Sequence, residues 1–339
     1  MKTSDFDYHL PPDLIAQTPI EPRHASRLLV LHRSTHIIDH STFWNIGGFL
    51  RPGDLLVVNQ TRVIPARISA RKPTGGRVEL LLLKRLDSIT WEALVGGKRI
   101  NTGSLLALEE GPQITVLKSL GGARRLVQFT EPVENYLKNH GQIPLPPYIH
   151  TRLEDPERYQ TIYSRVPGSA AAPTAGLHFT QELIEHLQAA NIHFASVLLH
   201  VGLDTFSPVK EEDPTHHAIH SEWCEVPPET AELVNNAWRV GGRVVAIGTT
   251  SVRALETAAI EAAAGERVAA WSGPTDLYIL PGYKFKAVDA MVTNFHLPRS
   301  TLLMLVSAFA GRELILRAYQ EAIQTGYRFF SFGDAMLIL

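Results

Sequence analysis

The sequence has a single cysteine, Cys224, among its 339 residues. One cysteine excludes an internal disulfide framework and is typical of a protein in a reducing compartment. No apolar run approaches the ~20 residues that span a bilayer, and residues 1–10 lack the basic and then apolar pattern of a signal peptide. These absences predict a cytoplasmic protein that does not associate with membranes.

An excess of charge of one sign is also absent, because 32 Lys and Arg residues against 34 Asp and Glu residues give a formal net charge of −2. Any binding of nucleic acid must therefore come from a local basic patch. The sequence also lacks GxGxxG after a strand, GxxxxGK followed by Ser or Thr, and HExxH. These gaps disfavour a Rossmann dinucleotide site, a P-loop nucleotide site and a zincin.

Strands and helices alternate in the C-terminal half of the chain. Apolar runs predict strands at 192–199, 243–247, 277–280, 287–295 and 329–332. Amphipathic or Ala-rich segments with capping residues predict helices at 180–190, 228–240, 252–264, 300–311 and 312–325. This alternation predicts an α/β domain with a parallel or mixed sheet.

The segment from 78 to 130 has a different pattern. Five short apolar runs, separated by Gly- and Pro-containing turn signals, lie at 78–83, 91–95, 104–108, 114–117 and 126–129. They predict a small barrel or sandwich. Because 54–64 resembles another strand of the main layer, we predict an inserted β-barrel-like domain at 63–148. The α/β catalytic domain is then discontinuous, at 1–62 and 149–339.

The segment Thr249-Thr250-Ser251-Val252-Arg253 lies where a predicted strand turns into a predicted helix. Its three hydroxyl residues can cap the backbone N–H groups of the first turn, and those groups can also bind an anion. Arg253 adds a planar donor fork that suits a carboxylate or a phosphate. The simpler alternative is an ordinary capped helix.

Other polar clusters also follow predicted strands. His200 ends one apolar run, and residues 293–301 join the end of another run to a helix start. In open α/β sheets, ligands gather at the carboxyl ends of strands, so we expect His200, Gly248-Thr249 and residues 294–296 to meet there. The loop at 171–179 consists largely of small residues, which would let a ligand approach the backbone closely.

Two further clusters leave two interpretations open. His216, His217, His220 and Glu222 could bind zinc, but no common closed-site spacing is matched, and a His220–Glu222 acid–base pair is the better functional interpretation. The other cluster is a basic stretch with no acidic residue within it. It is either a solvated edge or a patch that tracks phosphates, and it consists of Arg62, Arg67, Arg71, Lys72 and Arg77.

Together these clusters resemble one family, the S-adenosylmethionine:tRNA ribosyltransferase-isomerases of queuosine biosynthesis. The most specific matches are Pro-Thr-Ala-Gly-Leu-His-Phe at 173–179 and Thr-Asn-Phe-His-Leu-Pro at 293–298. The resemblance extends over the chain, at 7–11, 59–66, 144–149, 159–179, 199–209, 220–222, 248–253, 293–307 and 327–336. Two positions depart from the family pattern: Asp204 replaces a glycine, and Ile219 replaces a methionine.

The resemblance implies a fold, a mixed-sheet α/β domain with a β-barrel insertion, and a reaction. Such an enzyme transfers and isomerises the ribosyl part of S-adenosylmethionine onto 7-aminomethyl-7-deazaguanine (preQ1) at the wobble position of tRNA. The tRNA then carries epoxyqueuosine, and adenine and methionine are released. We therefore expect S-adenosylmethionine as co-substrate, tRNA as partner, no permanently bound cofactor, no metal and a monomeric protein.

The reaction needs a base for the carbon next to the sulfonium, an acid for the leaving adenine and a neutral attacking amine. The groups of suitable type in the motifs, which we predict to be catalytic, are His178, His200, His220 and Glu222. Predicted to bind S-adenosylmethionine are Thr174, Gly176, Gly202, Thr249, Thr250, Ser251, Arg253, Asn294 and His296. Predicted to bind tRNA are Arg62, Arg67, Arg71, Lys72 and, by stacking on a base, Phe295, with Tyr8 as another stacking candidate.

Three alternatives stay open at this point. A tRNA methyltransferase would use the same co-substrate but release S-adenosylhomocysteine. A zinc hydrolase would use His216, His217 and His220. A non-catalytic RNA-binding module would bind tRNA without consuming a co-substrate.

Overall fold

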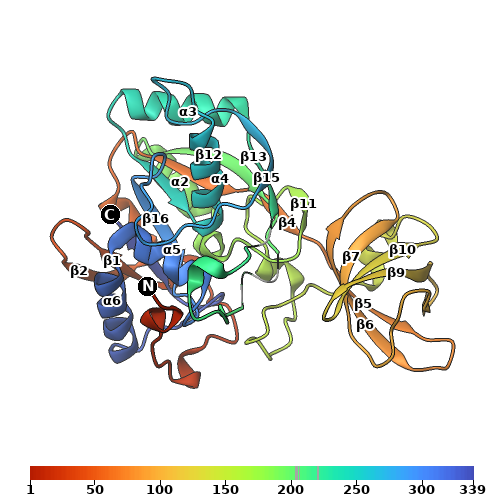
Figure 1. Cartoon of the computed structure of the whole chain (residues 1–339). Helices are drawn as coiled ribbons and strands as arrows, with labels where there is room; N and C mark the ends of the chain where they lie inside the picture. Colours follow the sequence, from red (N-terminus) through yellow and green to blue (C-terminus); the bar gives the residue numbers. More distant parts are fainter. Residues whose placement is uncertain (203–204, 206, 220) are drawn as a thin grey trace. The chain divides into compact units, whose positions relative to one another are not determined.

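The computed structural model describes residues 1–202, 205, 207–219 and 221–339. Two units make up the chain (Figure 1). One comprises Met1–Thr61, Pro146–Val166 and Ala172–Leu339, and the other comprises Arg62–Leu145 and Pro167–Ala171. We call them the sheet unit and the barrel unit. No described helix is long and apolar enough to cross a membrane.

The sheet unit contains a nine-stranded mixed sheet in its described part, in the order β15-β13-β12-β3-β14-β16-β17-β1-β2. Its strands are β1 (Arg27–Leu31), β2 (Ile38–Thr42), β3 (Leu55–Asn59), β12 (His193–Leu199), β13 (Glu222–Val226), β14 (Val244–Ile247), β15 (Trp271–Thr275), β16 (Ala290–Asn294) and β17 (Ala335–Ile338). The neighbours β12, β3, β14 and β16 run parallel. Their carboxyl ends therefore meet at one edge, which we call the active edge of the sheet.

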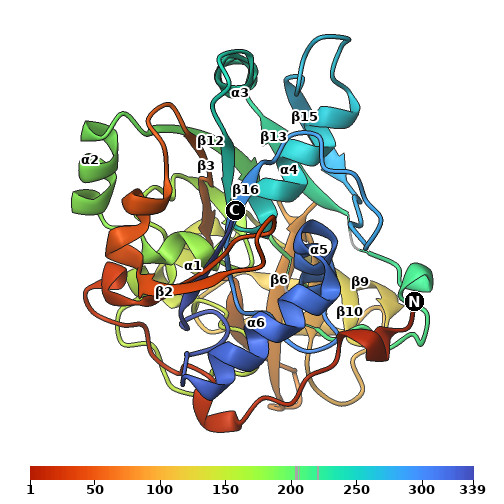
Figure 2. The ribbon, with the colours of Figure 1, turned by 90° about the vertical axis from the view of Figure 1, so that its left-hand side faces the viewer.

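Helices cover both faces of this sheet. They are α2 (Gln181–Ala189), α3 (Pro228–Arg239), α4 (Thr249–Ile260), α5 (Thr301–Ala310) and α6 (Arg312–Gln324). Figure 2 shows α2 on one side of the sheet and α4 and α5 on the other. Short 3₁₀ helices complete the unit at Thr3–Phe6, Pro12–Leu14, Arg23–Ala25, Phe43–Phe49, Pro156–Tyr159, Thr174–His178 and Pro214–His216.

Alternate strand residues build an apolar core on one face of the sheet. Successive side chains of a strand point to opposite faces, so Leu56 and Val58 of β3 share a face with Val245 and Ile247 of β14. Against them pack the apolar residues of α2 and of the 3₁₀ helix at Phe43–Phe49, namely Phe43, Ile46, Leu183 and Leu187. The periodicity of 2 in the strands and 3.6 in the helix thus produces one continuous core.

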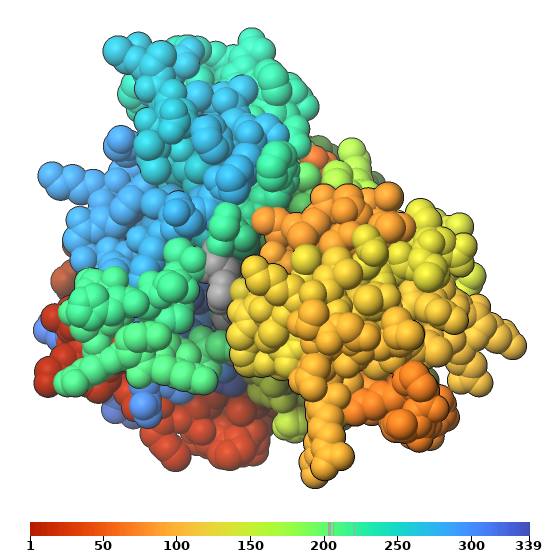
Figure 3. Space-filling model, turned by 45° about the vertical axis from the view of Figure 1, so that its right-hand side comes forward, coloured from red at the N-terminus to blue at the C-terminus, as the bar shows by residue number. Residues whose placement is uncertain are grey.

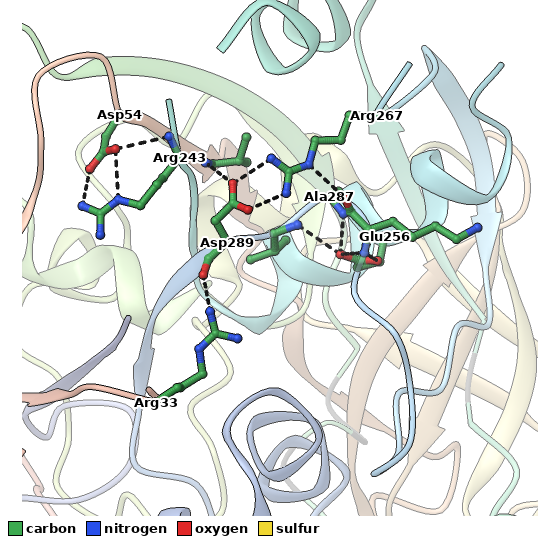
Figure 4. Close-up of polar contacts among 10 residues, drawn as sticks. Arg33, Asp54, Arg243, Glu256, Arg267, Ala287 and Asp289 are labelled. Carbon is green, nitrogen blue, oxygen red and sulfur yellow. Dashed lines mark hydrogen bonds and ion pairs between the residues drawn. The ribbon is translucent and has the colours of Figure 1, made fainter. Parts of the chain in front are cut away.

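Charged side chains fix the sheet at the edge opposite the active edge (Figure 4). Asp54, which precedes β3, pairs with Arg243, which precedes β14, at 2.6 Å. Asp289, which precedes β16, accepts two hydrogen bonds from Arg267, of 2.7 and 2.5 Å. Its carboxylate also accepts one from the backbone N–H of Val244. These bidentate pairs hold the starts of three neighbouring strands in register.

Glu256 fixes α4 to the segment that enters β16. This fully buried carboxylate accepts hydrogen bonds from the backbone N–H groups of Lys286, Ala287 and Val288 and from the hydroxyl of Tyr283 (Figure 4). Burial raises the pKa of Glu256, although these four donors oppose the shift. The first turn of α4 and the end of β16 both reach the active edge, so this contact ties together two elements that carry motif residues.

The barrel unit is a closed antiparallel barrel in the order β10-β7-β6-β5-β8-β9. Its strands are β5 (Arg67–Arg71), β6 (Arg77–Arg85), β7 (Thr90–Val95), β8 (Leu105–Leu108), β9 (Gln113–Gly121) and β10 (Arg124–Phe129), followed by helix α1 (Glu134–His140). A two-stranded sheet is formed by β4 (Thr61–Val63) and β11 (Val166–Ser169). The predicted fold class, a mixed α/β sheet with an inserted small β-barrel, is confirmed.

Two local predictions were wrong, and one barrel strand was not predicted. The sixth barrel strand, β5, was missed because its alternation lies inside the basic stretch. Residues 277–280 form a loop, and the strand lies instead at β15, whose Pro274 is tolerated because β15 is an edge strand. Residues 329–332 form a turn with Phe330 at a φ of 69°, and β17 is the last strand.

Candidate functional site

The active edge carries a narrow pocket of about 40 Å³. Its walls come from the segment before α2, from the turn between β14 and α4, and from the segment after β16. Gly248 makes the turn possible, since its φ of 89° is a conformation that favours glycine. We call this the strand-end pocket, and its polar lining residues include Thr174, Thr249, Thr250, Thr293, Asn294 and His296.

Thr250 presents an unsatisfied hydroxyl in this pocket. Its side chain is buried, at 8% exposure, and Oγ1 has no hydrogen-bond partner among the described residues. An unpaired buried polar group costs about 1–3 kcal/mol. The geometry therefore favours a ligand donor or acceptor at this point.

Asn294 connects the strand-end pocket to His178. Its Oδ1 accepts a hydrogen bond of 2.7 Å from Thr174, and its Nδ2 lies 3.4 Å from Nε2 of His178. Burial, with Arg23 and Arg328 nearby, lowers the pKa of His178 to about 3. The neutral ring then accepts at Nε2 and donates from Nδ1 to Ser26, at 2.8 Å. His178 thus orients Asn294 and does not itself line the strand-end pocket.

His296 lines the strand-end pocket with its ring held by Thr293. Nε2 and Thr293 Oγ1 are 2.7 Å apart. Burial lowers the pKa of His296 to about 3, so the imidazole is neutral near pH 7. Such a ring can hydrogen-bond a base edge or a ribose hydroxyl, but it holds no proton that it could give as an imidazolium.

A second pocket, of about 300 Å³, contains a buried ion pair. Arg253 of α4 pairs through Nη1 with Glu222, the first residue of β13. Glu222 also accepts a hydrogen bond of 2.7 Å from the backbone N–H of Gly202. We call this the ion-pair pocket. It shares Thr205 and Leu302 with the strand-end pocket, so the two pockets adjoin.

The structure therefore divides the motif at 249–253. Thr249 and Thr250 line the strand-end pocket, whereas Arg253 lines the ion-pair pocket. Ser251 lines neither, because its fully buried hydroxyl donates back to the carbonyl of Ile247 at 2.9 Å. The predicted contact of Ser251 with a ligand is not supported, since this hydroxyl is used to tie the first turn of α4 to the end of β14.

Of three other predicted residues, Gly176 and His200 lie outside the linings of these two pockets, whereas Phe295 lines the strand-end pocket. A Cβ on Gly176 would meet the hydroxyl of Tyr163 at 2.0 Å, so this glycine permits close packing. His200 shares a hydrogen bond of 2.8 Å with Thr61, and burial lowers its pKa. Phe295 is fully buried among Tyr319, Tyr327 and Phe329. Full burial in this cluster favours a packing role for Phe295, and its stacking on an RNA base stays a prediction.

His220 and Asp204 lie outside the described residues. The acid–base role of His220 and the effect of Asp204 on its loop stay predictions. Ile219, the other departure from the family pattern, lines the ion-pair pocket.

The basic residues that we predict to bind RNA belong to the barrel unit, which carries a net positive charge. It contains 13 Lys and Arg residues against seven Asp and Glu residues, a formal charge of +6, which leaves −8 for the sheet unit. Arg71 is exposed and lies directly opposite Arg77 on the neighbouring strand. Arg67 pairs with Glu79 at 3.0 Å, and Lys72 donates to the carbonyl of Lys98.

Comparisons with known proteins agree with this arrangement. Residues 3–338 match the model of a family described as "Queuosine biosynthesis protein". The S-adenosylmethionine:tRNA ribosyltransferase-isomerase of Symbiobacterium thermophilum is 57% identical, and that of Carboxydothermus hydrogenoformans is 54% identical, each over the full length of both chains. The chain belongs to this family.

A solved structure of the ribosyltransferase-isomerase family shows the same fold. The crystal structure of S-adenosylmethionine tRNA ribosyltransferase from Thermotoga maritima has 43% sequence identity and a TM-score of 0.58. The match covers 99% of this chain and 100% of the other. Membership of the ribosyltransferase-isomerase family favours neither a methyltransferase nor a zinc hydrolase. Within the described ranges, no three His, Cys, Asp or Glu residues form a metal-binding group, and His217 instead bonds Glu211 at 2.8 Å.

The sequence analysis did not predict several residues that line the ion-pair pocket. Lys210, Glu211 and Tyr278 line it, but none had been predicted, and His217 had been considered only as a zinc ligand. Lys210 and Glu211 directly follow the matching segment at 199–209, which was the available signal. Tyr278 lies in an apolar run that was predicted as a strand, so nothing in the sequence marked it.

Proposed function

We propose that this enzyme transfers and isomerises the ribosyl moiety of S-adenosylmethionine onto preQ1 at the wobble position of tRNA. The products are epoxyqueuosine in the tRNA, adenine and methionine. One observation carries this proposal: loops far apart along the chain meet at the active edge in two adjoining pockets, and they are the loops that carry the family motifs.

The strand-end pocket supplies polar contacts of the kind that the ribose or a base edge needs. Thr249, Thr250 and Asn294 offer hydroxyl and amide groups. Thr250 Oγ1 is the strongest candidate, because it is buried without a partner among the described residues. Thr174 and His178 keep Asn294 in one orientation, and Gly202 keeps Glu222 in one orientation.

Protonation states restrict the roles of the histidines. Burial lowers the pKa of His178, His200 and His296, so all three favour the neutral form. They are therefore better suited to positioning and hydrogen-bond acceptance than to protonating the leaving adenine. We assign proton transfer to His220, with Glu222 as its charged neighbour in the sequence. Since Arg253 and Gly202 hold Glu222, its carboxylate acts as a fixed charge.

The barrel unit provides the charge that a tRNA phosphate backbone requires. Its formal charge of +6 is the electrostatic pattern of a nucleic-acid-binding surface. We propose Arg62, Arg67, Arg71 and Lys72 as phosphate contacts, with Arg71 the most available. The tRNA and S-adenosylmethionine are the only partners that this proposal needs, and it takes the enzyme as a monomer.

The test is product analysis. The purified protein is incubated with S-adenosylmethionine and tRNA that carries preQ1, and the products are separated by chromatography. We expect adenine and methionine in equal amounts, together with epoxyqueuosine in the tRNA. Release of S-adenosylhomocysteine would instead identify a methyltransferase. In the same assay, His220→Ala should lower turnover about 10²–10⁴-fold, the range typical of a general acid or base, and a loss below ~10-fold would contradict this role.

A further inference from the structure

The ion-pair pocket is lined by both charged and apolar side chains. The charged residues include Lys210, Glu211 and the Glu222–Arg253 pair, and the apolar residues include Ile219 and Leu305. A pocket of about 300 Å³ with both signs of charge suits a small zwitterion with an apolar chain.

Arg253 keeps one donor group unused. Nη1 pairs with Glu222, and Nε donates to the carbonyl of Leu277 at 3.1 Å. Nη2 is buried and has no hydrogen-bond partner in the described part of the chain, and the residue as a whole is only 7% exposed. A buried guanidinium N–H without an acceptor is costly, and a ligand carboxylate would satisfy it with a charge-assisted hydrogen bond.

Glu211 supplies a fixed negative charge in the same pocket. Its Oε2 accepts from Nδ1 of His217 at 2.8 Å and from the backbone N–H of Lys210 at 3.2 Å. Hydrogen bonds of this kind lower the pKa of Glu211, so the carboxylate is ionised near pH 7. A carboxylate held in this way can accept hydrogen bonds from a ligand ammonium group.

The N-terminal segment holds the backbone around Glu211. Thr3 donates from Oγ1 to the carbonyl of Glu211 at 2.6 Å and from its backbone N–H to the carbonyl of Glu212 at 2.8 Å. Figure 3 shows this part of the chain, in green, beside the N-terminal residues, in red. Glu211 is thus fixed before any ligand arrives, which reduces the entropic cost of binding.

We propose that the ion-pair pocket binds the α-amino-acid end of S-adenosylmethionine, with Arg253 Nη2 on its carboxylate and Glu211 on its ammonium group. This inference rests on the proposed function. The methylene groups of the ligand lie along Ile219 and Leu305. The ribose reaches the strand-end pocket across Thr205 and Leu302, which line both pockets. Arg253 and Thr250 therefore hold different parts of one molecule.

The test uses three small probes on the full-length protein. L-methionine carries both charges, 3-(methylthio)propylamine lacks the carboxylate, and 4-(methylthio)butanoate lacks the ammonium group. Calorimetry measures their dissociation constants, and inhibition assays test competition with S-adenosylmethionine. We expect L-methionine to compete, and each truncated probe to bind at least tenfold more weakly.

Two variants assign each charge to its partner. Glu211→Gln should bind L-methionine and 4-(methylthio)butanoate with nearly equal affinity, because the ammonium group has lost its partner. Arg253→Gln should bind L-methionine and 3-(methylthio)propylamine with nearly equal affinity, because the carboxylate has lost its partner. Glu212→Gln is the matched control, since this neighbouring carboxylate pairs with Lys2 at the surface and lies outside the pocket. It should keep the preferences of the wild type.

Clear results would overturn the inference. L-methionine that fails to compete, or a Glu211→Gln variant with wild-type discrimination, would contradict it. Glu211→Gln decides the question even if Arg253→Gln fails to fold, because Glu211 is partly exposed, at 42% of its side chain. If the enzyme releases adenine but does not distinguish L-methionine from the two truncated probes, only the assignment of the ion-pair pocket fails. If L-methionine binds as expected but no adenine forms, the proposed function fails.

Discussion

The hydroxyl of Tyr8 donates a hydrogen bond of 2.5 Å to the backbone carbonyl of His296. The backbone N–H of His296 in turn donates to the hydroxyl of Tyr319 at 2.8 Å. Two tyrosines, one from the N-terminal segment and one from α6, therefore hold both backbone polar groups of a residue that lines the strand-end pocket. The rings of these tyrosines also contact each other edge to face. Tyr8, within the motif at 7–11, is thus placed to position His296, and its stacking on RNA stays a prediction.

Tyr8→Phe removes one of these two contacts. We expect a loss of ~1 kcal/mol in unfolding free energy, the usual worth of such a hydrogen bond. The KM for S-adenosylmethionine should rise about fivefold, which is the same energy expressed as affinity, while kcat changes less. Steady-state kinetics and urea unfolding measure these effects.

Tyr283→Phe is the control for Tyr8→Phe. It also removes a phenol hydrogen bond, of 3.0 Å to Glu256, but Tyr283 lines neither pocket. It should lower stability by a similar amount and leave KM unchanged. A wild-type KM for S-adenosylmethionine in Tyr8→Phe, or an equal change of KM in both variants, would show that Tyr8 does not position the site.

Thr250→Val tests the unsatisfied hydroxyl of the strand-end pocket. Valine keeps the shape of threonine and removes the buried Oγ1, which has no partner among the described residues. The free energy of unfolding should therefore stay equal or rise, whereas the KM for S-adenosylmethionine should rise about tenfold, equivalent to ~1.4 kcal/mol. Ser251→Ala should show the opposite pattern, lower stability with an unchanged KM, because the Ser251 hydroxyl bonds the carbonyl of Ile247 and lines neither pocket. Unchanged KM in Thr250→Val would mean that this hydroxyl meets no ligand.

Local patterns were enough to predict the elements that depend on local chemistry. Thr180 caps α2 by accepting from the N–H of Leu183, and Ser300 caps α5 by accepting from the N–H of Leu303. Both caps were predicted from residue type and position alone. The parallel strands β12, β3, β14 and β16 were likewise predicted, because each is a short apolar run between turn signals.

Tertiary contacts decide what the sequence could not show. The run at 277–280 is apolar enough for a strand, but the N–H of Leu277 bonds Thr275 and its carbonyl accepts from Arg253. Glu211 and Arg253 are 42 positions apart in the chain, and only the fold brings both into one pocket. The satisfied hydroxyl of Ser251 and the unsatisfied one of Thr250 are adjacent in sequence, so residue type alone could not distinguish them.

Acid should destabilise this protein through its buried histidines. The pKa values of His178 and His296 are about 3 in the folded protein, whereas an unperturbed histidine has a pKa of ~6.5. Below that value the unfolded chain binds more protons, so stability is full above pH ~6.5 and falls by ~1.4 kcal/mol per pH unit for each histidine down to pH ~3. Between pH 7 and pH 5, each should cost ~2 kcal/mol.

Urea unfolding at these two pH values measures this loss. His178→Asn and His296→Asn should each reduce the difference between pH 7 and pH 5 by ~2 kcal/mol, whatever they do to stability at pH 7. His9→Asn, at an exposed position, should leave the difference as it is. An unchanged difference in both buried variants would show that these rings do not resist protonation.

Salt dependence tests phosphate binding by the basic barrel unit. Arg71 and Arg77 face each other across β5 and β6, and like charges in this position repel, so a bound phosphate would relieve the repulsion. Arg71→Ala should therefore weaken tRNA binding and lower the slope of log K against log salt by about 0.7–0.9, the effect of one lost phosphate contact.

Arg67→Ala should have a smaller effect on this slope, since Glu79 already pairs with Arg67. Arg239→Ala removes the same charge from an exposed end of α3 and should leave the slope unchanged. Wild-type tRNA affinity that stays flat between low and moderate salt would contradict phosphate binding by this unit.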